Sequence, residues 1–127
     1  MQELVSIITP CYNSAKYIGQ MIESIQAQTY KNWELLITDD CSTDNSMEVV
    51  MSYAEKDSRV KFFKLPQNSG AGIARNNSIE KATGRYIAFC DSDDMWKAEK
   101  LEKQLQFMQD NNYEFCHCYT LVVDENN

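Results

Sequence analysis

Short apolar runs alternate along this chain with longer stretches in which apolar residues recur at i, i+3, i+4 and i+7. The short runs are typical of buried strands, and the longer spacing is typical of amphipathic helices. Strands are predicted at residues 5–8, 35–37, 60–65 and 86–90, with a closing strand over residues 113–123. Helices are predicted around residues 18–25, 47–54, 73–82 and 101–108. Asp44 is the expected N-cap of the second helix, and Gly84 is the expected left-handed cap that ends the third.

Strands that alternate with helices indicate an α/β fold, in which a mostly parallel sheet is covered by helices on both faces. Ligands of such sheets bind at the carboxyl ends of the strands. The polar segments "TPCYN", "DDCSTD" and "CDSDD" each follow a predicted strand directly. All three should therefore lie at one edge of the sheet, with their acidic residues close together.

Length and composition favour a single folded domain over residues 1–127, with 43% hydrophobic residues. The formal net charge is -7, and the 12 basic residues form no cluster, which argues against nucleic acid as a partner. No apolar run is long enough to span a membrane, and the N-terminus lacks the features of a signal peptide. The cysteines are odd in number and fit free thiols in a reducing compartment. We therefore expect a soluble, cytoplasmic protein.

Three carboxylates, Asp91, Asp93 and Asp94, follow the fourth predicted strand almost directly. Two like charges about 4 Å apart repel by about 4 kcal/mol at an effective dielectric of roughly 20. The Asp-x-Asp pattern of Asp91 and Asp93 suits a hard divalent cation, Mg²⁺ or Mn²⁺, which would offset this repulsion and bridge to phosphate oxygens. The same residues taken alone are also typical of an ordinary solvated turn.

Asp39 and Asp40 end the second strand, where a carboxylate can accept a hydrogen bond from the imide N–H of a base such as uracil. Tyr12 offers an aromatic face for stacking on a nucleobase, a contact worth roughly 1 to 3 kcal/mol. Two alternatives stay open at this point. The aspartates can serve as turn and cap formers, and Tyr12 can serve as a packed loop anchor.

The segment "NSGAGIARNN" begins a helix with Gly70 and Gly72 and places Arg75 in its first turns. Backbone N–H groups at a helix start, together with a guanidinium, suit a diphosphate. Two glycines outside a complete phosphate-binding motif are unspecific, however, and alone they favour a plain loop-to-helix junction.

The only histidine, His117, lies between Cys116 and Cys118. Alternation along a strand directs His117 away from both thiols, which argues against a zinc site. Because the chain has one histidine, no Ser-His-Asp or Cys-His nucleophilic centre is expected.

Four segments in register resemble the family 2 glycosyltransferases of the GT-A fold: "VSIITPCYN", "LLITDDCSTDNS", "NSGAGIARN" and "GRYIAFCDSDDMWKAEKLEKQ". The resemblance covers about residues 4–120 and implies a Rossmann-like half that binds a nucleotide-diphospho-sugar, with UDP the expected nucleotide. Pro10 and Tyr12 would then line the pocket for base and ribose. Asp40 would accept a hydrogen bond from the base, and Arg75 would approach the base or the diphosphate.

The resemblance also assigns the acidic cluster. Asp91 and Asp93 would be the family's Asp-x-Asp, with Asp93 the stronger candidate for direct contact with Mn²⁺ or Mg²⁺. Ser92, between them, is assigned to the donor-binding site.

By resemblance, the reaction is an inverting, metal-dependent transfer of a sugar to a hydroxyl of a saccharide or lipid-linked acceptor. The catalytic base is unknown and is expected beyond Asn127, in an acceptor-binding half, so this chain alone should lack it. The full-length protein is expected at the inner face of the membrane. Two alternatives remain, a catalytically inactive nucleotide-sugar-binding module and a receiver-type phosphoacceptor domain.

Overall fold

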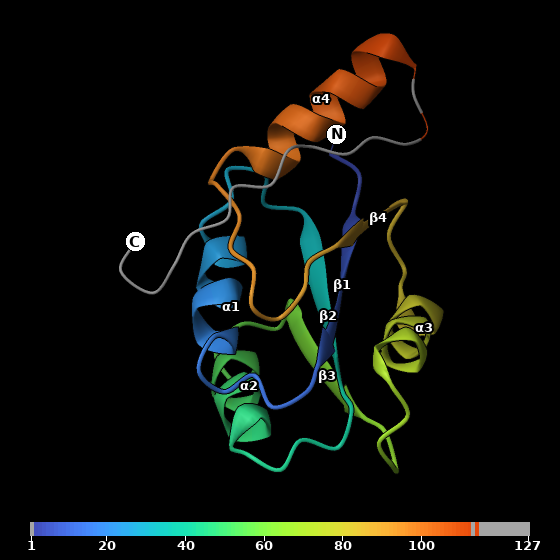
Figure 1. Cartoon of the computed structure of the whole chain (residues 1–127). Helices are drawn as coiled ribbons and strands as arrows, with labels where there is room; N and C mark the ends of the chain where they lie inside the picture. The colour runs from blue at the N-terminus through green and yellow to red at the C-terminus, as the bar shows by residue number, and fades with distance from the viewer. Residues whose placement is uncertain (1, 113, 115–127) are drawn as a thin grey trace.

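The computed structural model describes residues 2–112 and 114, in which strands and helices alternate (Figure 1). The strands are β1 (Val5–Cys11), β2 (Trp33–Asp39), β3 (Val60–Lys64) and β4 (Tyr86–Phe89). The helices are α1 (Ile18–Gln26), α2 (Ser46–Ala54), α3 (Ala71–Lys81) and α4 (Lys100–Asn111). All four strands are parallel and form one sheet in the order β3-β2-β1-β4, which confirms the predicted α/β fold with a parallel sheet.

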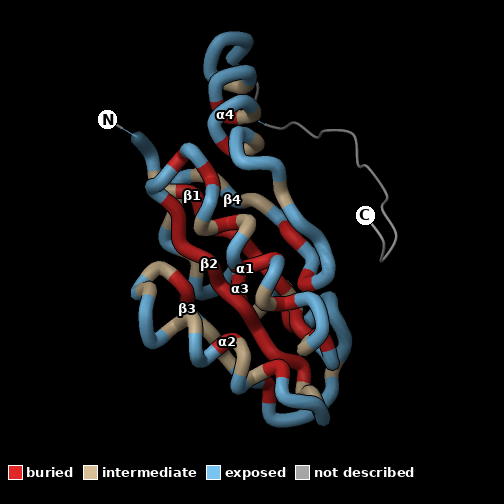
Figure 2. The backbone as a smooth tube through the Cα atoms, turned by 90° about the vertical axis from the view of Figure 1, so that its left-hand side faces the viewer, coloured by how far each residue is buried: buried red, intermediate tan, exposed pale blue. Residues whose placement is uncertain are grey.

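The central strands β1 and β2 are almost wholly buried, as the tube in Figure 2 shows. α1 and α2 cover one face of the sheet, and α3 covers the other (Figure 1). Alternate positions of β2 meet different layers: Ile37 belongs to the core cluster that includes Ile22 of α1, whereas Thr38 hydrogen-bonds to Ser78 of α3. Burial on both faces explains why these strands are continuous apolar runs.

The predicted role of Gly84 as a left-handed helix cap is wrong. Helix α3 ends at Lys81, and Ala82 caps it in an extended conformation. Gly84 instead lies against β1, where an added Cβ would be 2.7 Å from the backbone oxygen of Leu4 and 2.7 Å from Oγ of Ser6. The glycine is therefore needed for a close approach of two backbones rather than for a positive φ.

The predicted N-cap of α2 is displaced by one residue, because the cap position is Asn45. Asp44 still serves the helix start: its Oδ1 accepts hydrogen bonds from N of Ser46 at 3.0 Å and from Oγ of Ser46 at 2.5 Å. These bonds lower the pKa of Asp44. A carboxylate just before a helix start also complements the positive end of the helix dipole.

Several sequence predictions fall at the end of the chain. The closing strand and the Cys116-His117-Cys118 segment lie outside the described residues. Among the cysteines that the structure describes, Cys11, Cys41 and Cys90 are free thiols, as predicted. None of the helices within the described residues is both long enough and apolar enough to cross a bilayer.

Candidate functional site

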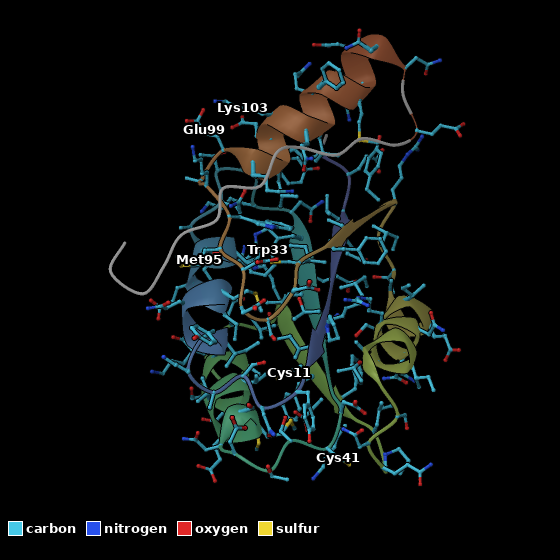
Figure 3. The ribbon with its side chains drawn as sticks, viewed as in Figure 1. Cys11, Trp33, Cys41, Met95, Glu99 and Lys103 are labelled. Carbon is cyan, nitrogen blue, oxygen red and sulfur yellow. The ribbon has the colours of Figure 1, made fainter. Side chains whose placement is uncertain are left out.

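The loops that follow β1, β2 and β4, together with the start of α3, surround a cleft of about 610 Å³. Parallel register brings these strand ends to one edge, since Cys11 lies opposite Asp39 and Ile8 opposite Phe89. Cys11 and Cys41 mark this edge in Figure 3. The cleft is lined by all seven site residues predicted from the sequence: Pro10, Tyr12, Asp40, Arg75, Asp91, Ser92 and Asp93.

Two aromatic side chains line the cleft on the β1 side. Tyr12 is 50% exposed, so it is not the packed loop anchor of the alternative interpretation. Tyr17 also lines the cleft and is 39% exposed; no local pattern singled it out in the sequence. The ring of Tyr12 is available for stacking on a flat ligand, whereas Nζ of Lys16 lies 5.3 Å from the centroid of the Tyr17 ring.

Asn13 holds the loop that carries Tyr12. It adopts a left-handed conformation with φ 47°, which asparagine tolerates better than most residues. Its Oδ1 accepts a hydrogen bond from N of Thr43 at 2.8 Å, and its own N–H donates to Oγ of Ser42 at 2.9 Å. The β1–α1 loop is thereby fixed to the β2–α2 loop. Sequence analysis missed this residue because its partners lie about thirty positions away.

The two aspartates after β2 have different roles. Asp39 is buried and accepts hydrogen bonds from N and Oγ of Ser42, so it is a turn former, as the alternative interpretation proposed. Asp40 is 4% exposed and lines the cleft, where its carboxylate accepts N–H groups of Ser69 at 2.6 Å and Gly70 at 2.9 Å. A carboxylate has about four acceptor positions, so Asp40 retains capacity for a ligand N–H.

The start of α3 is less open to anions than its glycines suggest. Gly70 has φ 98° and occupies the N-cap position, and its N–H is already bonded to Asp40, as is that of Ser69. The cation that faces the cleft from this helix is Arg75, whose NH2 lies 3.1 Å from Oδ1 of Asp91. The pair is partly exposed, so a ligand can reach both of its members.

The acidic loop after β4 carries more negative charge than its surroundings offset. Burial, and then the charges of Asp93 and Asp91, raise the pKa of Asp94. An added positive charge would therefore be favourable here. Asp91 and Asp93 line the cleft and supply the carboxylate oxygens that Mg²⁺ and Mn²⁺ prefer.

The described residues do not form a complete metal cage, because no group of three His, Cys, Asp or Glu side chains among them is placed to hold an ion. Two carboxylates suit a cation that takes its remaining ligands from a phosphate and from water, as Mg²⁺ commonly does. The donor set fits such a cation when it arrives with a phosphorylated ligand.

The two buried thiols near the cleft are unsuited to nucleophilic chemistry. Burial, and then the charge of Asp39, raise the pKa of Cys11 to about 11. Burial, and then the charge of Asp94, raise the pKa of Cys90 to about 12. Both thiols are therefore protonated at neutral pH, and the thiolate is the reactive form.

Comparison with known proteins identifies the family. The model of glycosyl transferase family 2 matches residues 6–127. The chain belongs to this family. Family 2 membership confirms the resemblance noted in the sequence and makes the receiver-domain alternative wrong.

Curated relatives of this family 2 chain come from several bacteria. It is 48% identical over 123 residues to TuaG of Bacillus subtilis (strain 168), provisionally named a teichuronic acid biosynthesis glycosyltransferase, covering 96% of this chain and 49% of that protein. It is 45% identical over 123 residues to WfgD of Escherichia coli, a UDP-Glc:alpha-D-GlcNAc-diphosphoundecaprenol beta-1,3-glucosyltransferase, covering 97% of this chain and 48% of that protein. The chain thus spans about half the length of these relatives.

Solved structures confirm the GT-A fold. The crystal structure of Staphylococcus aureus TarS 1-349 in complex with UDP has a TM-score of 0.79 and 35% identity, covering 85% of this chain and 32% of that one. The mannosyltransferase PcManGT from Pyrobaculum calidifontis, in complex with GDP-Man and Mn²⁺, has a TM-score of 0.75 and 26% identity, covering 85% of this chain and 33% of that one.

Proposed function

We propose that this chain is the donor-binding half of an inverting, metal-dependent glycosyltransferase that uses a nucleotide-diphospho-sugar, with UDP as the nucleotide. The observation that carries the proposal is the single cleft at the carboxyl ends of the strands, in which an aromatic loop, a buried carboxylate, an arginine and an acidic loop converge. The TarS complexes with UDP and UDP-GlcNAc support the choice of nucleotide.

Each wall of the cleft has a proposed task. Tyr12, beside Pro10, would stack on the base, and Asp40 would accept the base imide N–H with the acceptor capacity that Ser69 and Gly70 leave unused. Arg75 would pair with the diphosphate, exchanging one anionic partner for another.

Asp91 and Asp93 would hold the cation, with Asp93 as the direct ligand. Bound there, Mn²⁺ or Mg²⁺ would offset the charge that develops on the departing nucleoside diphosphate. The protein's own contribution is to keep these two carboxylates in the cleft beside the end of β4. The Mn²⁺ complex of PcManGT, a structural neighbour, supports the proposal of a divalent metal here.

In our proposal, residues 1–127 contain neither the acceptor-binding residues nor the catalytic base. We propose a saccharide or lipid-linked acceptor, because WfgD is named for a diphosphoundecaprenol-linked substrate. An acceptor of that kind places the full-length protein at the cytoplasmic face of a membrane. The base that deprotonates the acceptor hydroxyl is proposed to lie beyond Asn127.

The test is calorimetric titration of UDP into this protein with Mn²⁺, repeated with a chelator and with uridine. We expect metal-dependent binding of UDP, little dependence of uridine on metal, and loss of the metal-dependent increment in Asp93→Ala. Asp110→Ala, an exposed aspartate on α4, is the matched control and should bind as the parent does. If UDP binds Asp93→Ala as tightly as the parent, the metal assignment is wrong.

A further inference from the structure

A pair of buried serines joins two loops of the cleft, the aromatic loop after β1 and the acidic loop after β4. Ser14 follows β1, and Ser92 stands between Asp91 and Asp93 after β4. The two side chains are only 8% and 9% exposed, and their Oγ atoms are 2.6 Å apart. We propose that Ser14 and Ser92 are positioning residues that lock the acidic loop to the base-binding loop. This inference rests on the proposed function of the cleft.

The direction of the hydrogen bond between the two hydroxyls follows from their other partners. Each hydroxyl has one proton to donate and two lone pairs to accept with. Oγ of Ser14 donates to the backbone oxygen of Tyr12 at 3.1 Å, and a carbonyl can only accept. The proton between the two hydroxyls must therefore come from Ser92. The chain of hydrogen bonds runs from Ser92 to Ser14 and on to the carbonyl of Tyr12.

Ser14 is a firm anchor because its backbone is held separately. Its N–H donates to Oγ of Ser46, at the start of α2, at 2.8 Å. Ser46 is in turn bonded to Asp44 through both its N–H and its hydroxyl. Ser14 thus connects the loop after β1 with the start of α2 and with the acidic loop after β4, and a shift of the acidic loop must break the bond between Ser92 and Ser14.

In this arrangement Ser92 acts through Ser14, while its predicted place in the donor-binding site stays a prediction. Its single proton is directed to Ser14. What it controls is the placement of the flanking carboxylates of Asp91 and Asp93 relative to the carbonyl of Tyr12. The base and the diphosphate are parts of one ligand, so binding of the base fixes where the diphosphate lies. The two loops that contact them must therefore keep a constant separation.

The first experiment needs no ligand. Amide hydrogen exchange is measured by NMR in the parent, Ser14→Ala and Ser92→Ala, with Ser52→Ala, whose hydroxyl is exposed on α2, as the control. We expect cross effects: Ser92→Ala should speed exchange at the amide of Ser14, and Ser14→Ala should speed it at the amide of Asp94, which is bonded to the carbonyl of Asp91. An effect of about fivefold corresponds to one hydrogen bond. Variants that are folded but show no cross effect would overturn the proposal.

The second experiment uses UDP with Mn²⁺ and uridine without it. Each single variant should weaken the binding of UDP about fivefold and should weaken the binding of uridine less. The double variant should bind UDP no more weakly than either single variant, because each single variant has already lost the bond between Ser14 and Ser92. Equal losses for UDP and uridine, or additive losses in the double variant, would show a merely structural role. If the parent binds no UDP, the proposed function fails while hydrogen exchange still judges the serine pair.

Discussion

Glu34, at the amino end of the sheet, and Asp94, in the acidic loop at the carboxyl end, have pKa values shifted in opposite directions. At the amino end, Glu34 is 4% exposed and accepts hydrogen bonds from Oγ of Ser6 at 2.6 Å, N of Thr83 at 2.8 Å and Nζ of Lys61 at 3.1 Å. Burial alone would raise its pKa, but these bonds outweigh burial and lower it. At the carboxyl end, burial and neighbouring charges raise the pKa of Asp94.

The difference supports the proposed division, in which the amino end of the sheet serves folding and the acidic loop at the carboxyl end serves binding. At the amino end, the protein itself supplies the donors that a buried charge needs. At the carboxyl end, Asp91, Asp93 and Asp94 lie within four residues of one another, and Arg75 pairs with Asp91. Local energetic conflict of this kind is expected at functional sites, where a ligand resolves it.

The largest effect is expected from Glu34→Gln. The amide replaces one acceptor oxygen with a donor that faces the donors of Ser6, Thr83 and Lys61. The free energy of unfolding should fall by about 2 to 4 kcal/mol, because the variant removes the buried negative charge to which these three donors are bonded. Urea denaturation measures this change.

Glu99→Gln is the matched control for that variant. Glu99 is exposed on the surface near α4, 3.6 Å from Lys103 (Figure 3), and such a pair contributes at most about 1 kcal/mol. If Glu34→Gln costs no more than Glu99→Gln, the amino end is not the stabilising end.

Arg59→Ala should have the next largest effect, at the same end of the sheet. The guanidinium lies 3.9 Å from the ring centroid of buried Trp33, and its NH2 is 2.9 Å from Oδ2 of Asp57. Loss of this stacking and pairing should lower the free energy of unfolding by about 1 to 2 kcal/mol. Arg85→Ala, in which the arginine lies 3.8 Å from Glu3 and 6.0 Å from the ring of Tyr86, should change it by less than about 0.5 kcal/mol. Equal losses in the two variants would contradict the prediction.

Acid should weaken the amino end by a smaller amount. The pKa of Glu34 in the folded protein lies below its usual value of 4.5, so the stability it contributes is present above that value. It is lost as the pH falls through the lowered pKa. Thermal melts of the parent should therefore fall in temperature below about pH 4.5, and Glu34→Gln should show a flatter profile. A variant profile parallel to that of the parent would count against Glu34 as the titrating group.

The helical and strand spacings of the sequence were sufficient to predict the parallel sheet and the edge at which the candidate site residues gather. They worked because both faces of β1 and β2 are covered, which forces continuous apolar runs, and because strand ends in a parallel sheet converge. Six of the seven predicted site residues lie at these strand ends and converge for the same reason, whereas Arg75 reaches the cleft from α3.

Contacts between distant segments escaped the sequence analysis. Ser14 and Ser92 are 78 positions apart, and Glu34 and Thr83 are 49 apart, so no local spacing reports either pair. Gly84 was misassigned because a glycine near a helix end suggests a positive φ, whereas its actual constraint is the backbone of β1. A charged residue inside an apolar strand, as in "WELLITD", was the one visible signal of the Glu34 network.

The smallest effect on stability, and the sharpest test of the comparison, is expected from Arg75→Ala. Its pair with Asp91 is partly exposed on both sides, so the free energy of unfolding should change by less than about 0.5 kcal/mol. Binding should change in two opposite directions. Mn²⁺ alone should bind more tightly, since the guanidinium no longer competes for Asp91, whereas UDP with Mn²⁺ should bind more weakly, since the diphosphate loses its arginine. Manganese electron paramagnetic resonance and calorimetry measure the two affinities, with Arg85→Ala as the control, and weaker binding of Mn²⁺ alone would show that Arg75 organises the acidic loop instead of competing with the cation.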